Sequence, residues 1–207
     1  MISVGAGLSA SREDICNDAL GLLGMDPIAD IDDTDDANAV KCKQFFDLTR
    51  DSLLRRHAWA FAVTRVELAQ LEDGPAFGYT YAYQLPSDCL RLLAAAEEGE
   101  DLDSATLATA GLQYAVEAGS VLTDSETCYA KYLARVEETG LFDPLFCEAL
   151  SKALAVKLAN AFTKSDAIVQ KMAALADIAY RQATTVNCSE VGTVSVRKYS
   201  SLADARN

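Results

Sequence analysis

Two kinds of hydrophobic periodicity divide this sequence, and they constrain its fold more than any other feature. Near both ends of the chain, apolar residues recur every three or four positions, which is typical of amphipathic helices. From about residue 60 to residue 136 this spacing gives way to short alternating runs between turn residues, which is typical of β-strands. The order predicts two helices, a β insertion and two further helices.

The first two helices are predicted over about 11–23 and 36–57. Ser11 is a typical N-cap residue, and the acidic residues that follow it suit the positive end of the helix dipole. The face predicted to be buried in the first helix is Ile15, Ala19, Leu22 and Leu23. In the second helix it is Ala39, Cys42, Phe46, Thr49 and Leu53, widened by Phe45, Leu48 and Leu54.

The last two helices are predicted over about 143–162 and 165–183. Asp143 is predicted as an N-cap with Pro144 at the first helical position, where the missing N–H of proline costs nothing. A broad apolar stripe runs along the third helix, so we expect it to be central in the fold. The predicted buried face of the fourth helix is Ile168, Met172, Leu175 and Ala179.

The two ends of the chain lack helical periodicity. Residues 1–10 are small and Gly-rich and are predicted to form an N-terminal arm, and residues 184–207 are predicted to form an extended C-terminal tail. Residues 11–183 then make one domain, with the β insertion at about 60–136. The expected fold class is mainly α: a four-helix bundle with a small antiparallel β insertion and extended terminal arms.

Several short segments carry the strand pattern. Ala118-Gly119 is predicted to join the last two short strands of the insertion as a hairpin. The predicted strands are 63–68, 79–85, 90–95, 112–117 and 120–123. The segment 128–136 fits either a strand or a helix, and a strand that ends near Tyr132 is favoured.

The stretch YTYAYQLPSDCLRLL, residues 79–93, is the most unusual part of this insertion. Alternation of Tyr79, Tyr81 and Tyr83 predicts three aromatic rings on one face of a strand, and the residues 86–88 predict a corner before the next strand. Because aromatic rings stack on sugars, a carbohydrate platform is an alternative to a purely structural role.

Charge limits the classes of function. The chain has 31 acidic and 18 basic residues, a formal charge of −13. A protein that grips nucleic acid needs concentrated Lys and Arg, so this balance argues against nucleic-acid binding as the main function. An acidic wall would instead repel DNA that passes close by. The densest acidic segments are 30–36 and 97–103.

Motifs for metals and cofactors fail on inspection. There are six cysteines, none in a C-x-x-C pair, and one histidine, which argues against a zinc site and indicates buried, reduced thiols. DIDDTDD, residues 30–36, lacks the glycine and glutamate that a calcium loop needs at its sixth and twelfth positions. GAGLSA, residues 5–10, resembles a dinucleotide-binding turn, but no strand precedes it. We expect no cofactor and no metal.

Catalytic signals are equally weak. His57 has no nucleophile partner in a recognisable motif, and with Arg55 and Arg56 it suits the negative end of a helix. Paired carboxylates of the kind that cleave glycosides have no specificity in a chain this acidic. No long apolar run predicts a membrane span, and the first fifteen residues do not resemble a signal peptide. We expect a non-enzymatic protein that assembles in the cytoplasm.

Five segments in order resemble the tail tubular protein A, or head-to-tail adaptor, family of short-tailed bacteriophages. They are ICNDALGLLG (15–24), LLRRHAWAFA (53–62), YAYQLPSDCLRLL (81–93), YAVEAGSVLT (114–123) and FDPLFCEALSKALAVKLANAFT (142–163). The resemblance covers roughly residues 11–183, and its motifs are structural rather than catalytic. The two ends of the chain show no clear match.

The resemblance implies a structural virion protein in the tail or neck, assembled in the host bacterial cytoplasm. It implies a ring, a dodecamer in this family, that docks beneath the portal protein and joins it to the tail nozzle, a tubular protein B-like protein. Other copies of the chain would be partners, no membrane would take part, and DNA would pass through the ring only as cargo during ejection. The alternatives are a tail-associated peptidoglycan hydrolase and a soluble helical assembly factor that leaves the mature particle.

Two sets of residues are candidates for contacts in such a ring. The tail is mildly basic on an acidic protein and carries valines that suit a partner's sheet edge or groove, so it is predicted to bind the portal or a neighbouring subunit. Its candidate residues are Val191, Val194, Val196, Arg197, Lys198 and Tyr199. A polar loop of the β insertion is predicted to face the DNA channel or its mouth, with an outward solvated loop as the alternative. Its acids are Glu97, Glu98, Glu100, Asp101 and Asp103.

Overall fold

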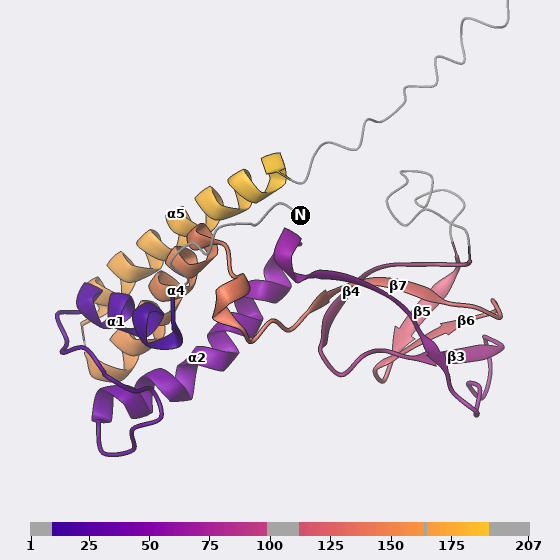
Figure 1. Cartoon of the computed structure of the whole chain (residues 1–207), viewed down its shortest axis with the longest axis horizontal. Helices are drawn as coiled ribbons and strands as arrows, with labels where there is room; N and C mark the ends of the chain where they lie inside the picture. The colour runs from indigo at the N-terminus through magenta and orange to yellow at the C-terminus, as the bar shows by residue number, and fades with distance from the viewer. Residues whose placement is uncertain (1–9, 99–111, 164, 191–207) are drawn as a thin grey trace, which may run out of the picture. The chain divides into compact units, whose positions relative to one another are not determined.

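Four α-helices and two antiparallel β-sheets make up the part of the chain that the computed structural model describes, residues 10–98, 112–163 and 165–190. The chain divides into two units, which we call the helical unit and the β unit (Figure 1). The described residues of the helical unit lie within 10–64, 87–92 and 132–190, and those of the β unit lie within 65–86 and 93–131.

The predicted fold class is wrong. Among the described residues, 49% are helical and 20% are in strands, and the strands form one sheet of three and one of four, so the fold is mixed α/β rather than a mainly α four-helix bundle. Alternation between residues 60 and 136 did indicate strands. The extent of the two sheets depends on pairing between segments far apart in the sequence, and the pattern of a single strand does not show which segments pair.

The helical unit is organised around α4. The helices are α1 (Arg12–Leu22), α2 (Ala37–Arg56), α4 (Pro144–Phe162) and α5 (Asp166–Glu190). α4 contacts each of the other three (Figure 1), as its broad apolar stripe predicted. Its buried residues include Phe146, Leu150, Leu154 and Leu158.

Local capping explains where three of these helices begin. The Ser11 side chain accepts a hydrogen bond from the Asp14 N–H, and the Asp14 carboxylate accepts one from the Ser11 N–H, which is a complete capping box. Asp36 and Asp143 cap α2 and α4 through their carboxylates, with Pro144 at the first position of α4. The N-caps predicted at Ser11 and Asp143 are confirmed.

The predicted central seam of α2 is confirmed, but its widening is confirmed only at Leu54, since Phe45 is half-buried and Leu48 is exposed. The predicted faces of α1 and α5 are partly wrong. All five seam residues of α2, from Ala39 to Leu53, are buried. In α1, Leu22 is exposed, and Cys16 and Leu20 are buried instead. In α5, Ile168 is exposed and Leu175 is half-buried. Packing against α4 rather than hydrophobicity alone decides which stripe of each helix is covered.

α5 is longer than predicted. It runs to Glu190, so residues 184–190 are helical and not part of an extended tail. The reason is a buried amide in the last turns. Asn187 accepts a hydrogen bond from the Ala60 N–H at 3.0 Å and donates one to the Ala58 carbonyl at 3.3 Å. These bonds hold the end of α5 against the segment that follows α2.

An aromatic cluster fills the interior of the helical unit. Trp59 is fully buried, and its indole N–H donates to the Leu53 carbonyl at 3.1 Å. The ring of Phe146 lies 5.0 Å from Trp59, 5.1 Å from Phe61 and 5.0 Å from Phe142, each in an edge-on arrangement. Such edge-on contacts are the favoured geometry for aromatic pairs.

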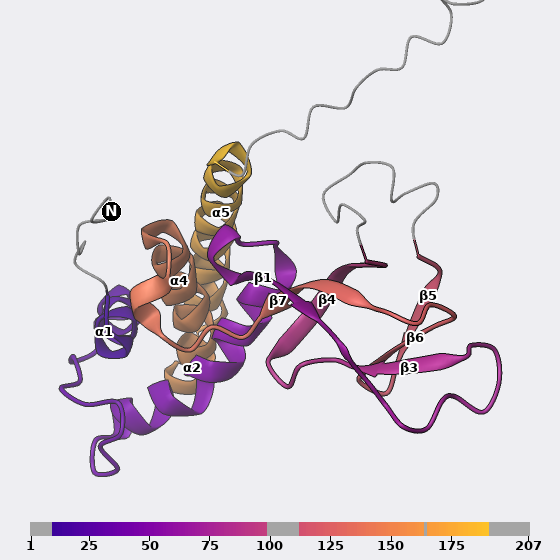
Figure 2. The ribbon, with the colours of Figure 1, turned by 45° about the vertical axis from the view of Figure 1, so that its right-hand side comes forward.

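The β unit contains a four-stranded antiparallel sheet with the order β2-β3-β6-β5 (Figure 2). Its strands are β2 (Ala69–Gln70), β3 (Tyr81–Gln84), β5 (Tyr114–Glu117) and β6 (Ser120–Thr123). The predicted hairpin is confirmed: Glu117 pairs with Ser120, and Ala118 and Gly119 have φ angles of 47° and 78°. Two successive residues with positive φ are the signature of a tight hairpin turn that follows the twist of the strands.

The three-stranded sheet has the order β1-β7-β4. Its strands are β1 (Val63–Glu67), β4 (Cys89–Ala96) and β7 (Tyr129–Ala134). β7 continues two residues beyond Tyr132, where the strand was predicted to end. Short 3-10 helices lie at Ala60–Ala62 and Thr139–Leu141.

Candidate assembly surface

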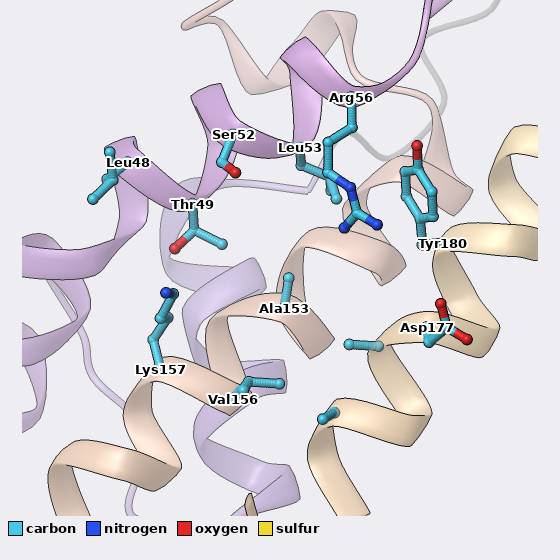
Figure 3. Close-up of a pocket in the computed structure, with 12 residues that line it drawn as sticks. Leu48, Thr49, Ser52, Leu53, Arg56, Ala153, Val156, Lys157, Asp177 and Tyr180 are labelled. Atoms are coloured by element: carbon cyan, nitrogen blue, oxygen red, sulfur yellow. The ribbon is translucent and has the colours of Figure 1, made fainter. Parts of the chain in front are cut away.

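A largely apolar groove on the helical unit is the candidate interaction surface of the described residues. It lies among α2, α4 and α5 and has a volume of about 490 Å³ (Figure 3). We call it the helical groove. Its lining residues are Leu48, Thr49, Ser52, Leu53, Arg56, Ala153, Val156, Lys157, Ala173, Ala176, Asp177 and Tyr180.

Helical spacing explains how these residues meet. On each helix the lining positions recur at three- and four-residue intervals, which places them on one face. Each helix thus turns one stripe towards a shared hollow. Three of the lining side chains are alanines, at 153, 173 and 176, and such short side chains leave space that a leucine would fill.

Leu48 shows that this face lacks a cover among the described residues of the helical unit. The apolar pattern of α2 predicted that Leu48 would widen the buried seam, and this prediction is wrong, because the residue is 72% exposed. Figure 3 shows Leu48 at one end of the groove and Tyr180 at the other. A large exposed apolar residue beside a hollow marks an interaction surface more often than an isolated one does.

The rim of the helical groove carries basic groups. The Arg56 guanidinium lies over the Tyr180 ring at 4.1 Å from its centroid, which is a cation–π contact (Figure 3). Among the described residues, neither Arg56 nor Lys157 has a carboxylate within ion-pair distance. Asp177 is already paired with Arg181 at 2.7 Å. The groove is therefore apolar within and positive at its edge, on a protein of net charge −13.

Most of the sequence-predicted contact residues lie outside the described part of the chain. All six candidate residues of the tail, from Val191 to Tyr199, lie outside the described residues. In the acidic loop, Glu97 and Glu98 are exposed, and the Glu98 N–H donates to the Thr127 hydroxyl at 3.4 Å. The remaining acids of that loop, Glu100, Asp101 and Asp103, lie outside the described residues.

The other acidic segment, residues 30–36, acts locally. Asp30 and Asp33 each accept a hydrogen bond from the backbone N–H two residues on, at 2.8 Å, and so close turns. Asp32 pairs with Lys43 at 2.9 Å, and the hydrogen bond from that ammonium lowers the pKa of the Asp32 carboxyl. Within the ranges that the structure describes, no cluster of three or more potential metal ligands occurs.

His57 occupies a structural position at the C-terminal end of α2. Its Nε2 atom lies 2.9 Å from the Asn187 side-chain nitrogen, and its ring lies 4.8 Å from Trp59. Burial, and then the positive charge of Arg91, lower the pKa of this imidazole. Its neighbours therefore hold the ring as part of the helical unit rather than aim it at a reacting group.

The cysteines are free, and their burial differs. Cys16, Cys42 and Cys128 are buried, whereas Cys89 and Cys147 are half-buried. Cys188 is exposed, so the prediction of buried thiols is wrong at that position. Cys16 on α1 and Cys42 on α2 interact as thiols, and this contact together with burial raises the pKa of Cys16.

The tyrosine stretch does not form an exposed platform. Tyr83 is buried, and its hydroxyl donates to the Ser125 carbonyl at 2.8 Å. Burial raises the pKa of its phenol. Tyr81 is half-buried, and Tyr79 lies before the first residue of β3. Consecutive residues Ala82 and Tyr83 are both buried, so both faces of this short strand are covered and the three rings do not share an open face.

A search with protein-family models found no match for this chain, and a search of curated proteins found no similar sequence. No helix within the described ranges is both long and apolar enough to cross a bilayer.

Sequence reasoning missed the helical groove. The signal was present in part, because Leu48 follows the seam residues of α2 by helical spacing but lies at the edge of the stripe, where burial depends on a neighbour. Alanines at 153, 173 and 176 were compatible with close helix packing as well as with a hollow. Close packing and a hollow can be told apart only when the faces of α2, α4 and α5 are seen together.

Proposed function

We propose that this chain is a structural subunit that works by assembling with other copies and with neighbouring proteins, as a head-to-tail adaptor of a short-tailed phage. The observation that carries the assembly part is the helical groove, an uncovered apolar hollow with a basic rim on an otherwise well-filled helical unit. The adaptor part rests on the ordered sequence resemblance over roughly residues 11–183.

In this proposal the ring joins a portal protein above to a tail nozzle below. The tail beyond Glu190 binds the portal or a neighbouring subunit through Val191, Val194, Val196, Arg197, Lys198 and Tyr199. Ordering a segment of this kind costs roughly 1–2 kcal/mol per residue in conformational entropy, so its valines and basic groups must recover that cost in the complex.

Electrostatics suit passing DNA. A net charge of −13 gives the ring a repulsive wall wherever its acids face the channel. In this proposal, Glu97, Glu98, Glu100, Asp101 and Asp103 face the channel or its mouth. Repulsion between exposed charges is screened beyond about 8 Å at physiological salt, so it acts only on DNA that comes close.

The decisive test combines two measurements. Mass spectrometry of purified virions asks whether the chain is in the mature particle, and co-sedimentation with the portal ring encoded in the same genome asks whether it binds there. The adaptor proposal expects both. A chain that is absent from virions but needed for assembly is an assembly factor, and failure to co-sediment with the portal removes the main support for the adaptor.

Truncation separates the tail from the helical unit. Because Asn187 is buried in the last turns of α5, the deletion should begin at residue 191. We expect the chain lacking 191–207 to keep its helical circular dichroism and to lose portal binding. Normal portal binding by the truncated chain would remove the tail from the proposal.

Two assays address the remaining parts. Replacing the five acids of residues 97–103 by Lys should slow DNA ejection in vitro, most at low salt, and an unchanged rate at all salt concentrations would place this loop outside the channel. The purified chain should not clear a layer of bacterial cell wall. Clearing would favour the peptidoglycan hydrolase instead.

A further inference from the structure

A single aromatic residue in the β unit stands out as unpartnered. Phe77 is 89% exposed, the highest exposure of any large hydrophobic residue among those described. It lies in the loop of residues 71–80, which connects β2 to β3. Exposing a ring of this size to water is unfavourable, since a buried Phe removes about 150–250 Å² from solvent.

The loop is built to hold this ring outward. At its end, the Thr80 N–H and hydroxyl both donate to the Asp124 carboxylate at 2.9 Å. Gly74 approaches so closely that a Cβ there would lie 2.8 Å from the Thr80 carbonyl oxygen, and Gly78 has a φ of 90° that other residues rarely adopt. A loop fixed in this way loses little freedom when it binds, which favours a role as an anchor.

Charge makes the loop complementary to the helical groove. Glu72 and Asp73 precede Phe77 in the loop, and neither has an ion-pair partner among the described residues. The groove offers the converse, an apolar hollow of about 490 Å³ with Arg56 and Lys157 at its edge. One feature thus presents an aromatic ring flanked by acids, and the other an apolar cavity flanked by bases.

We propose that the Phe77 loop, residues 71–80, of one copy inserts into the helical groove of a second copy. The inference rests on the proposed function as an oligomeric ring subunit and names the contact that joins neighbouring copies. Because the two patches are different surfaces of the same chain, the contact is head-to-tail, and repeated contacts of this type close into a ring when the rotation per subunit allows it.

The C-terminal segment is an alternative occupant of the groove. The C-terminal residues 191–207 carry apolar Val191, Val194 and Val196, but Arg197 and Lys198 follow them directly. Those cations would meet Arg56 and Lys157, and like charges brought together at an interface are unfavourable. The acidic Phe77 loop is the better match by charge.

The contact is an anchor within a larger interface. Stable protein–protein interfaces bury about 1,200–2,000 Å² in total, well beyond one ring and its loop. Their energy is nonetheless concentrated in a few central aromatic and Arg residues seated in pockets. Phe77 in the groove, with Arg56 beside it, has this character.

Cross-linking between differently labelled copies tests the contact directly. Full-length chains carry either Ala76→Cys in the loop or Ala173→Cys at the groove, both at exposed positions, with Cys188→Ser removing the exposed native thiol. A short bismaleimide is added to each chain alone and to the mixture, and intact mass is read. We expect a covalent dimer from the mixture and none above background from either chain alone.

Substitutions then ask what the cross-link depends on. Adding Phe77→Ser to the Ala76→Cys chain should weaken association by about 30-fold or more, as expected for loss of an aromatic anchor. Val116→Ser is the matched control, because Val116 is an exposed apolar residue of the same unit outside the loop. Lys157→Glu should weaken the cross-link, and combining it with Glu72→Lys on the partner chain should restore it.

Three results would overturn the inference. The first is no dimer from the mixture at the highest concentration reached, and the second is a dimer unaffected by Phe77→Ser. The third comes from a chain that carries both Ala76→Cys and Ala173→Cys, and is a cross-link formed within that one chain. Portal co-sedimentation of the wild-type chain is measured in parallel. Portal binding without the cross-link rejects this contact and spares the adaptor, whereas the cross-link without portal binding does the reverse.

Discussion

The helical unit and the β unit differ in what fills them. Large side chains occupy the interior of the helical unit, where Trp59, Phe46, Phe146 and several leucines have no solvent exposure. The buried residues of the β unit are mostly small: of the described ones, several are alanines, and the larger ones are Leu68, Tyr83 and Val121.

Side-chain hydrogen bonds compensate in part for the small buried side chains of the β unit. The Tyr83 hydroxyl reaches the Ser125 carbonyl, the Thr123 hydroxyl donates to the Gln113 carbonyl at 3.0 Å, and Thr80 is held by Asp124. A net hydrogen bond is worth about 0.5–1.5 kcal/mol, less than the burial of a large apolar side chain, about 1.5–3 kcal/mol.

The two units thus differ in how much of the stability of the chain they carry. Residues of the helical unit carry the larger share of buried apolar surface, so substitutions in its interior should be the most damaging. The β unit is held by ladders and scattered side-chain bonds and presents loops, which suits a surface that contacts partners.

The largest effect is expected for Trp59→Ala. Removing this buried ring leaves a cavity among Phe61, Phe146 and Tyr180, and such changes typically cost about 3–5 kcal/mol. Urea denaturation followed by circular dichroism at the helical band measures it. Leu141→Ala, at an exposed leucine of the same unit, is the control and should change stability by less than about 0.5 kcal/mol. A cost for Trp59→Ala as small as that of the control would break the contrast.

A smaller effect is expected for Tyr83→Phe in the β unit. The change deletes the hydroxyl that donates to Ser125 while keeping the ring, so the cost should be about 1 kcal/mol. Hydrogen exchange of peptides that cover β3 and β6 should quicken. Tyr81→Phe on the same strand serves as the comparison, since its hydroxyl has no hydrogen-bond partner among the described residues. Equal effects of the two changes would show that the Ser125 bond contributes nothing.

A change of the opposite sign is expected in the β5–β6 turn. Ala118 has a φ of 47°, a left-handed conformation that alanine adopts at a cost and asparagine tolerates better. Ala118→Asn should therefore stabilise the hairpin by about 0.5 kcal/mol and slow hydrogen exchange in β5 and β6. Gly119→Ala, at a φ of 78°, should do the reverse. Destabilisation by Ala118→Asn would contradict the turn geometry.

The smallest expected effect is a pH dependence in the helical unit. Burial lowers the pKa of His57, so near its unfolded pKa of about 6.5 the unfolded chain binds more protons than the folded chain. Stability should fall as the pH drops below that value. The lowered pKa values of Asp14 and Asp32 act only at a pH near or below about 4.

Urea midpoints across this range measure the effect. His57 is the only histidine of the chain. His57→Gln should therefore flatten the plot of stability against pH between about pH 4 and about pH 6.5. A slope that survives in this variant would mean that another group causes it.

Local features of the sequence predicted a large part of the fold. Caps at Ser11 and Asp143 and the turn at Ala118-Gly119 were visible because each depends on residues within a few positions. The fold class was wrong because strand pairing is non-local, and the end of α5 was misplaced because Asn187 is satisfied by backbone groups well over a hundred positions away.

The candidate site could hardly be predicted from the sequence, because it too depends on non-local contacts. The helical groove depends on which faces of three helices meet, and the alanines at 153, 173 and 176 do not by themselves indicate a hollow. Leu48 was assigned to the buried seam by its spacing, although it is exposed among the described residues. Phe77 was not singled out from the sequence, because its exposure is a property of the folded loop.

The chain contains one tryptophan and eight tyrosines. That tryptophan, Trp59, sits in the interior of the helical unit with Tyr180 at 6.3 Å, so its emission reports on one half of the molecule alone. Tyr79, Tyr81, Tyr83, Tyr114 and Tyr129 all belong to the other half. Excitation at wavelengths that only indole absorbs would therefore follow the unfolding of the helical unit, with no emission from the tyrosines of the β unit.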